Sequence, residues 1–124
     1  METASKTLGI IGEELAAQYL RNRGYKVLLR NYECLLGEID LVARHKDTLV
    51  FVEVKTRSSE EMGLPAEGVT LRKRQQIIRC AKYYLKRYRL EDVPCRFDVV
   101  SVWMLEGREP VLEVIPDAFG EGGR

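Results

Sequence analysis

The sequence is poor in the residues that serve zinc sites and thiol chemistry. It has one histidine, His45, and its three cysteines, Cys34, Cys80 and Cys95, show no CxxC spacing. This pattern argues against a zinc site, and nothing in the sequence brings His45 near a thiol to make a catalytic pair. Three thiols without a pairing pattern suit a reducing compartment, so we expect a cytoplasmic protein.

Long apolar runs and a charge excess of one sign are also missing. No stretch of about 18 apolar residues is present, so we expect no membrane span. The formal net charge is only +1, which excludes a polycation that coats nucleic acid through its overall charge. The 124 residues, of which 45% are hydrophobic, are enough for one core. We therefore expect a single domain over residues 1–124, with a frayed tail at 117–124.

The spacing of the apolar residues predicts two helices and five strands. Leu8, Ile11, Leu15 and Tyr19 recur at helical spacing, whereas "EIDLVAR" and "TLVFVEVKT" flank the polar turn "HKD" as the strands of a β-hairpin do. The expected helices cover 6–23 and 70–88, the expected strands cover 25–33, 38–44, 48–56, 95–105 and 110–116, and a loop covers 58–68. This order predicts an α/β fold with a mixed sheet and helices packed on it.

Two carboxylates and a lysine interrupt the apolar hairpin. Strand alternation places Glu53 and Lys55 on one face, and antiparallel pairing brings Asp40 beside Glu53 if the two faces coincide. Converging carboxylates repel unless a cation lies between them, and Mg²⁺ or Mn²⁺ accepts one or two carboxylates together with water and phosphate oxygens. Lys55 would then orient or deprotonate a water, or neutralise charge that develops on a phosphate. The pattern fits phosphodiester hydrolysis.

A simpler interpretation of the same residues is a solvated strand face. A weak ion pair between Glu53 and Lys55 on such a face is worth about 0–1 kcal/mol, and for the tripeptide E-x-K alone this interpretation is the better one. Asp40 on the expected partner strand shifts the balance, as do the apolar neighbours in "LVFVEV", where an unpaired carboxylate is costly. The two interpretations are then about equal.

The second predicted helix carries its positive charge on one side. Between Val69 and Leu90 there are eight Lys or Arg residues and no Asp or Glu. The residues expected on one face are Arg72, Arg79, Lys82, Lys86 and Arg89. Such a stripe suits a phosphate backbone, although a charged face that only keeps the protein soluble gives the same pattern. Tyr84 and Tyr88 on the other side are expected in the core rather than against nucleic-acid bases.

Several motifs, in their order along the chain, resemble one known family. "GEIDLVA" followed by "VFVEVKTR" is similar to the signature of the YraN-like family of predicted endonucleases, which belongs to the PD-(D/E)xK superfamily with restriction endonucleases and Holliday-junction resolvases. "GEELAAQYL", Lys73 after "VT", "RFDVVSV" and "AF" extend the match over nearly the whole chain. Ile39 stands where the superfamily has its name-giving proline, as is usual in the family itself.

The resemblance implies a restriction-endonuclease-like fold with an α-β-β-β-α-β core and a metal site. In this core Asp40 and Glu53 would be ligands of Mg²⁺ or Mn²⁺, with the Val54 carbonyl as a further ligand. Lys55 would act on the attacking water.

The resemblance also implies a catalytic glutamate in the first helix. Glu14 lies at the border of the expected apolar face beside Ile11, whereas Glu13 is expected to point further toward solvent. We therefore select Glu14 as the catalytic candidate.

Nucleic acid, above all DNA, is the expected partner. The predicted contacts are Arg57, Arg72, Lys73, Arg79, Lys82 and Lys86. A homodimer is an expectation carried over from junction-cutting relatives. Three functions remain open: a metal-dependent endonuclease, a nuclease-like module that binds nucleic acid without cutting it, and a protein-contact module that rests on the apolar stretch "PVLEVIPDAF".

Overall fold

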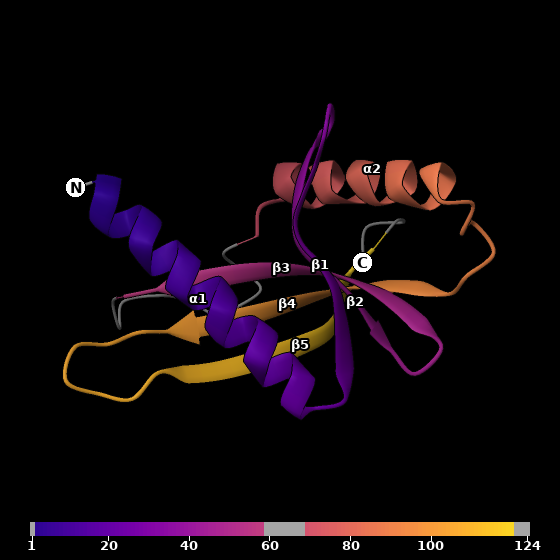
Figure 1. The fold of residues 1–124 in the computed structure, drawn as a ribbon. Helices are drawn as coiled ribbons and strands as arrows, with labels where there is room; N and C mark the ends of the chain where they lie inside the picture. Colours follow the sequence, from indigo (N-terminus) through magenta and orange to yellow (C-terminus); the bar gives the residue numbers. More distant parts are fainter. Residues whose placement is uncertain (1, 59–68, 121–124) are drawn as a thin grey trace.

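One five-stranded sheet carries a helix on each face (Figure 1). The computed structural model describes residues 2–58 and 69–120, with side chains from Thr7 onward. The elements in chain order are α1 (Glu2–Asn22), β1 (Tyr25–Cys34), β2 (Gly37–His45), β3 (Thr48–Arg57), α2 (Leu71–Arg87), β4 (Cys95–Trp103) and β5 (Val111–Phe119). No helix in this part of the chain is long and apolar enough to cross a membrane.

The strands lie in the sheet in their sequence order, β1 to β5. All neighbours are antiparallel except β3 and β4, which run parallel because α2 makes the crossover between them. The α/β prediction and its order of elements are confirmed. The predicted frayed tail is wrong at its start, since β5 extends to Phe119 and the Phe119 side chain is buried. Most of the predicted loop, 59–68, lies outside the described residues.

Helix α1 approaches the sheet closely because its buried face is made of small residues. Ala16, Ala17 and Leu20 are fully buried against the apolar side chains of β3 and β4. At Gly12 even a Cβ has no room beside the Thr56 hydroxyl of β3. Ile11, which the periodicity placed in the core, is instead 43% exposed. The helix is thus turned relative to the expectation, which matters for the glutamates next to Gly12.

The hairpin of β1 and β2 bends away from the sheet at Asn31 and Asp40. Asn31 has a positive φ of 54°, and the ladder shows no pair between Asn31 and Asp40, although it pairs the residues on either side of them. Beyond the bend, residues 32–39 form a projection that stands beside α2 in Figure 1; we call it the arm. Its bend brings Ile39 into the same core cluster as Val42, so the alternation of strand side chains fails here.

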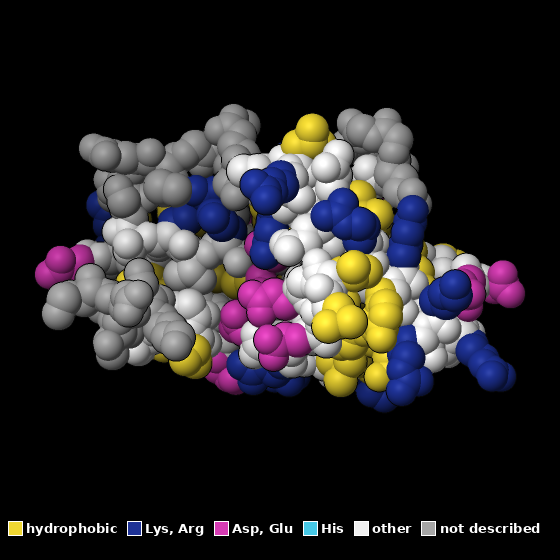
Figure 2. Space-filling model, turned by 90° about the horizontal axis from the view of Figure 1, so that it is seen from above, with side chains coloured by type: hydrophobic (Ala, Val, Ile, Leu, Met, Phe, Trp, Pro, Cys, Tyr) yellow, Lys and Arg dark blue, Asp and Glu magenta, His cyan; other side chains and the backbone are white. Residues whose placement is uncertain are grey.

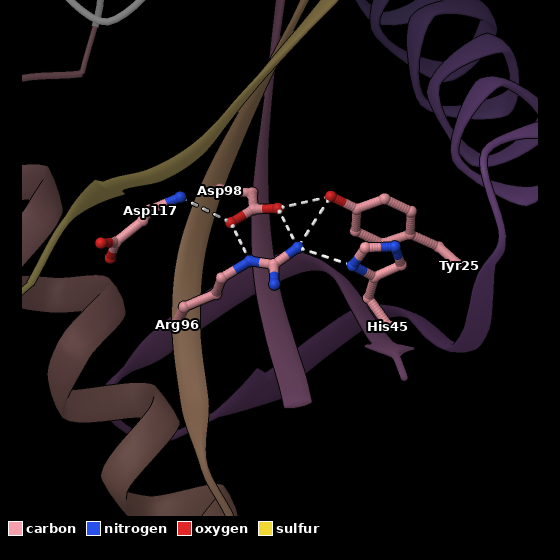
Figure 3. Close-up of polar contacts among 5 residues, drawn as sticks. All are labelled: Tyr25, His45, Arg96, Asp98 and Asp117. Atoms are coloured by element: carbon pink, nitrogen blue, oxygen red, sulfur yellow. Dashed lines mark hydrogen bonds and ion pairs between the residues drawn. The ribbon is translucent and has the colours of Figure 1, made fainter. Parts of the chain in front are cut away.

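A buried polar network joins four strands on the side of the sheet remote from the arm (Figure 3). Asp98, which is fully buried at a bulge of β4, accepts hydrogen bonds from the Tyr25 hydroxyl at 2.9 Å, from Arg96 Nε at 3.0 Å and from the Asp117 backbone N–H at 2.9 Å. Arg96 also contacts His45 Nδ1 at 3.1 Å, and the His45 ring stacks on Tyr25. The network therefore connects β1, β2, β4 and β5.

Candidate metal and phosphate site

The candidate site lies where β2 separates from β3. Their ladder ends at the pair Leu41 and Val52. The next backbone donor on this edge of β3, the Val54 N–H, donates instead to Asp40 Oδ2 at 2.8 Å. This hydrogen bond holds the Asp40 carboxylate against β3 and replaces a ladder bond that the bend of the arm removes.

The carboxyl groups of Asp40 and Glu53 meet at this edge, as the strand alternation predicted. Glu53 is half-buried, and its carboxyl group shares a hydrogen bond with that of Asp40. Burial, followed by the charge of Asp40, raises the pKa of Glu53 from 4.5 to about 8, although Lys73 and Lys55 oppose the shift. Glu53 therefore keeps its proton at neutral pH beside the Asp40 carboxyl group.

The helix α1 contributes Glu13 to the site, not Glu14. Burial, followed by the charge of Asp40, raises the pKa of Glu13, and the Asn31 side chain hydrogen-bonds to its carboxyl group. Glu14 is exposed and forms an ion pair with Arg30 at 2.7 Å. The expected orientation of the two glutamates is therefore wrong. The feature of the sequence that could have predicted this orientation is the set of small residues Gly12, Ala16 and Ala17, which forms the face of α1 that packs closely on the sheet.

Two lysines place positive charge beside these carboxyl groups. Lys55 shares a strand face with Glu53, two residues further along β3, and Lys73 reaches the site from the first turn of α2. Thr70 caps this helix by accepting a hydrogen bond from the Lys73 N–H at 3.1 Å, so the positive end of the helix dipole lies close to Lys73. The combination of carboxylates and cations suits a phosphate held by a metal ion.

The donor set fits Mg²⁺ or Mn²⁺ better than zinc. The two carboxyl groups of Asp40 and Glu53 provide hard oxygen ligands of the kind that these ions prefer. The N–H and C=O of one strand residue point toward the same neighbouring strand, so the Val54 carbonyl lies on the Asp40 side of β3. In the described residues no group of three His, Cys, Asp or Glu side chains is arranged to hold a metal ion, so water and phosphate oxygens would complete the shell.

The sequence of the chain matches one family over most of its length. The family described as "Uncharacterised protein family UPF0102" matches residues 12–102, which include every residue of the candidate site. The chain belongs to the UPF0102 family. A UPF0102 protein of Moorella thermoacetica is 49% identical over 121 residues, which cover 96% of this chain and 100% of that protein. A UPF0102 protein of Lachnoclostridium phytofermentans is 49% identical over 93% of this chain and 97% of its own length.

The basic residues of this UPF0102 chain do not all reach the surface. Helix α2 carries Arg72, Lys73, Arg79, Lys82 and Lys86 at exposed or half-buried positions, as the stripe predicted. Arg57 was predicted to contact nucleic acid, but only 4% of it is exposed at the end of β3, where it lies on the face covered by α2. Arg57 therefore does not present its guanidinium group at the surface, unlike the other predicted contacts.

Replacing Glu53 by glutamine should stabilise the metal-free UPF0102 protein at alkaline pH. The folded state keeps a proton on Glu53 up to about pH 8, whereas the unfolded chain loses it near pH 4.5. The folded wild type thus binds more protons in this window, and its free energy of unfolding falls as pH rises, by up to about 1.4 kcal/mol per pH unit. Glutamine has no proton to lose in this pH range, so the free energy of unfolding of the variant does not fall in this way. Urea unfolding in EDTA from pH 5 to 9 should show the advantage of the variant growing up to about pH 8; a constant difference would contradict it.

Proposed function

We propose that this protein is a metal-dependent nuclease that hydrolyses phosphodiester bonds, with DNA as its principal substrate. The meeting of the Asp40 and Glu53 carboxyl groups beside two lysines, where β2 separates from β3, is the observation that supports this proposal most strongly. The resemblance of the chain to PD-(D/E)xK nucleases gives the same assignment. Membership of the UPF0102 family is compatible with it.

Each residue of the site has a separate task in this mechanism. Asp40 and Glu53, with the Val54 carbonyl, would hold Mg²⁺ or Mn²⁺, which supplies positive charge against the scissile phosphate. The Asp40 carboxylate is oriented beforehand by the Val54 N–H, so it does not have to reorganise when the ion binds. Lys55 acts on the attacking water or neutralises charge on the phosphate as the bond to the leaving oxygen breaks.

Glu13 and Lys73 complete the site from the two helices. Glu13 is partly buried within reach of the charge of Asp40, and in this mechanism its carboxylate accepts a hydrogen bond from the attacking water. Lys73 follows the N-terminal cap of α2, where a phosphate is attracted by both the ammonium group and the helix dipole. In this mechanism α1 therefore supplies the residue that contacts the attacking water, and α2 supplies the residue that attracts the substrate phosphate.

The proposal is tested by offering linear, flapped and branched DNA to the purified protein with Mn²⁺, with Mg²⁺ and with EDTA. We expect cleavage only with metal. Glu13→Gln should slow cleavage by about tenfold to a hundredfold, whereas Glu14→Gln, a matched change one residue along α1, should leave the rate within about twofold. Salt-sensitive binding without cleavage of any substrate would instead identify a non-catalytic nucleic-acid-binding module.

A further inference from the structure

A groove separates the arm from α2. It is lined by Tyr32, Glu33, Cys34 and Leu35 of the arm and by Tyr83, Arg87 and Tyr88 of the helix and its C-terminal cap. Its volume of about 510 Å³ lies within the range of about 300–1,000 Å³ that is typical of ligand sites. Neither Asp40 nor Glu53 lines it, so it is a feature separate from the carboxylate site.

The walls of the groove expose large apolar side chains. Leu35 at the tip of the arm is completely exposed, and Tyr83 and Tyr88 are 43% and 51% exposed. Tyr88 was expected in the core, so this prediction is wrong. The exposed Tyr88 ring packs against the buried Tyr84, whose centroid lies 4.8 Å from that of Tyr88 and 5.2 Å from that of the half-buried Tyr32. Tyr83 lines the same groove. Tyr83 and Tyr88 thus form an aromatic surface that remains open to solvent.

The charges along the groove are arranged with opposite signs on its two sides. Helix α2 has no Asp or Glu, and towards the groove it presents Arg87, whose guanidinium lies 5.6 Å from the centre of the Tyr88 ring. The arm carries Glu33 and Glu38, which lie directly opposite each other in the β1–β2 register. A bound polyanion would therefore run along the helix side of the groove. Figure 2 shows acidic, basic and hydrophobic side chains side by side on this face of the molecule.

The groove continues toward the carboxylate site. A second hollow shares Glu33 and Cys34 with it and extends to Lys73 and Gln76. Lys73 is one of the two lysines whose charge lowers the pKa of Glu53. From Lys73 to Tyr83 the helix rises about 15 Å, the length of roughly four stacked nucleotides.

We infer that this groove binds unpaired nucleotides, with bases stacked on Tyr83 and Tyr88 and phosphates along α2. In a duplex both faces of each base are already covered, so an exposed tyrosine ring selects bases that have left the helix. The inference rests on the proposed function and narrows it. The substrate is a nucleic acid with a single-stranded segment that begins within about five nucleotides of the scissile phosphate.

Binding measured in EDTA, where no cleavage occurs, tests the inference. The ligands are a duplex and the same duplex with a single-stranded tail that carries a fluorescent base analogue. We expect the wild type to prefer the tailed DNA and to quench the analogue. Replacing both Tyr83 and Tyr88 by alanine should weaken binding of the tailed DNA about tenfold to a hundredfold and change duplex binding by less than about twofold. Phenylalanine at both positions should preserve the affinity, as should Tyr19→Ala on α1.

The outcomes separate this inference from the proposed nuclease activity. Equal affinity of the wild type and the double alanine variant for tailed DNA, while the wild type cuts DNA with Mn²⁺, would overturn the groove assignment alone. Tyrosine-dependent binding of tailed DNA without any cleavage would support the groove and overturn the catalytic assignment. If the double alanine variant changes only the sedimentation of the protein, the groove is a contact between two copies of the chain, and the inference is wrong.

Discussion

Replacing Asp40 by asparagine should lower the rate of metal-dependent cleavage by about a hundredfold to a thousandfold without unfolding the protein. Asparagine keeps an oxygen that can accept the hydrogen bond from the Val54 N–H, so the local backbone should remain in place. It removes the negative charge needed for a divalent cation. It also relieves the repulsion that raises the pKa of Glu53, so the metal-free variant should be at least as stable as the wild type at pH 8.

Cleavage rates and urea unfolding curves of the same preparations check this prediction. Asp47→Asn is the matched control, since Asp47 is an exposed acid in the turn between β2 and β3 and should leave both quantities unchanged. Full metal-dependent activity of the Asp40 variant would remove Asp40 from the mechanism. A large loss of stability would instead assign Asp40 a structural role.

Replacing Asp98 by alanine should lower the free energy of unfolding by about 3–5 kcal/mol, the largest stability effect that we expect in this chain. Asp98 is fully buried and pairs with Arg96, whose side chain is only 21% exposed. Its removal leaves the guanidinium group, the Tyr25 hydroxyl and the Asp117 N–H without their shared acceptor. The bulge of β4 then loses its connection to β1 and β5.

Urea unfolding monitored by circular dichroism measures this loss. Asp92→Ala, at an exposed position between α2 and β4, should shift the free energy by no more than about 0.5 kcal/mol. Tyr25→Phe removes two hydrogen bonds of the network, the one that the hydroxyl donates to Asp98 and the one that it accepts from Arg96, and should cost about 1–3 kcal/mol. If Asp98→Ala were as mild as Asp92→Ala, the network would not hold the strands together.

The sequence predicted the features that depend on short-range periodicity. The hairpin pattern of β2 and β3 predicted that Asp40 and Glu53 meet, because a tight turn fixes the register of these strands up to the pair Leu41 and Val52. The bend of β2 just beyond this pair, where the alternation fails, was not predicted. The basic character of α2 and the burial of Tyr84 follow in the same way from helical spacing. These predictions required no knowledge of distant contacts.

The errors occur where packing between distant segments decides the result. The large residues of α1 suggested one buried face, but the helix packs through Gly12, Ala16 and Ala17, and this rotation exchanges the roles of Glu13 and Glu14. Small residues give weak signals in hydrophobic patterns, although they allow the closest approach of a helix to a sheet.

The R-x-D pattern of β4 resembles the E-x-K pattern of β3 in sequence, yet the two have different environments. Asp98 is enclosed by a network whose partner Tyr25 lies 73 residues away, whereas Glu53 lies beside a second carboxyl group at an open edge. Only the fold separates a buried structural carboxylate from one that we propose as a cation ligand. Arg57 illustrates the same point, because it was predicted to contact nucleic acid and the fold buries it.

Isothermal titration of Mn²⁺ into the nucleic-acid-free protein at pH 7, in two buffers of different ionisation enthalpy, tests the cation site most directly. With the pKa of Glu53 at about 8, binding of the ion should release close to one proton in the wild type. The Glu53→Gln variant should bind the ion weakly and release no proton. Absence of binding by the wild type, or binding without proton release, would contradict the assignment of Asp40 and Glu53 as a divalent-cation site.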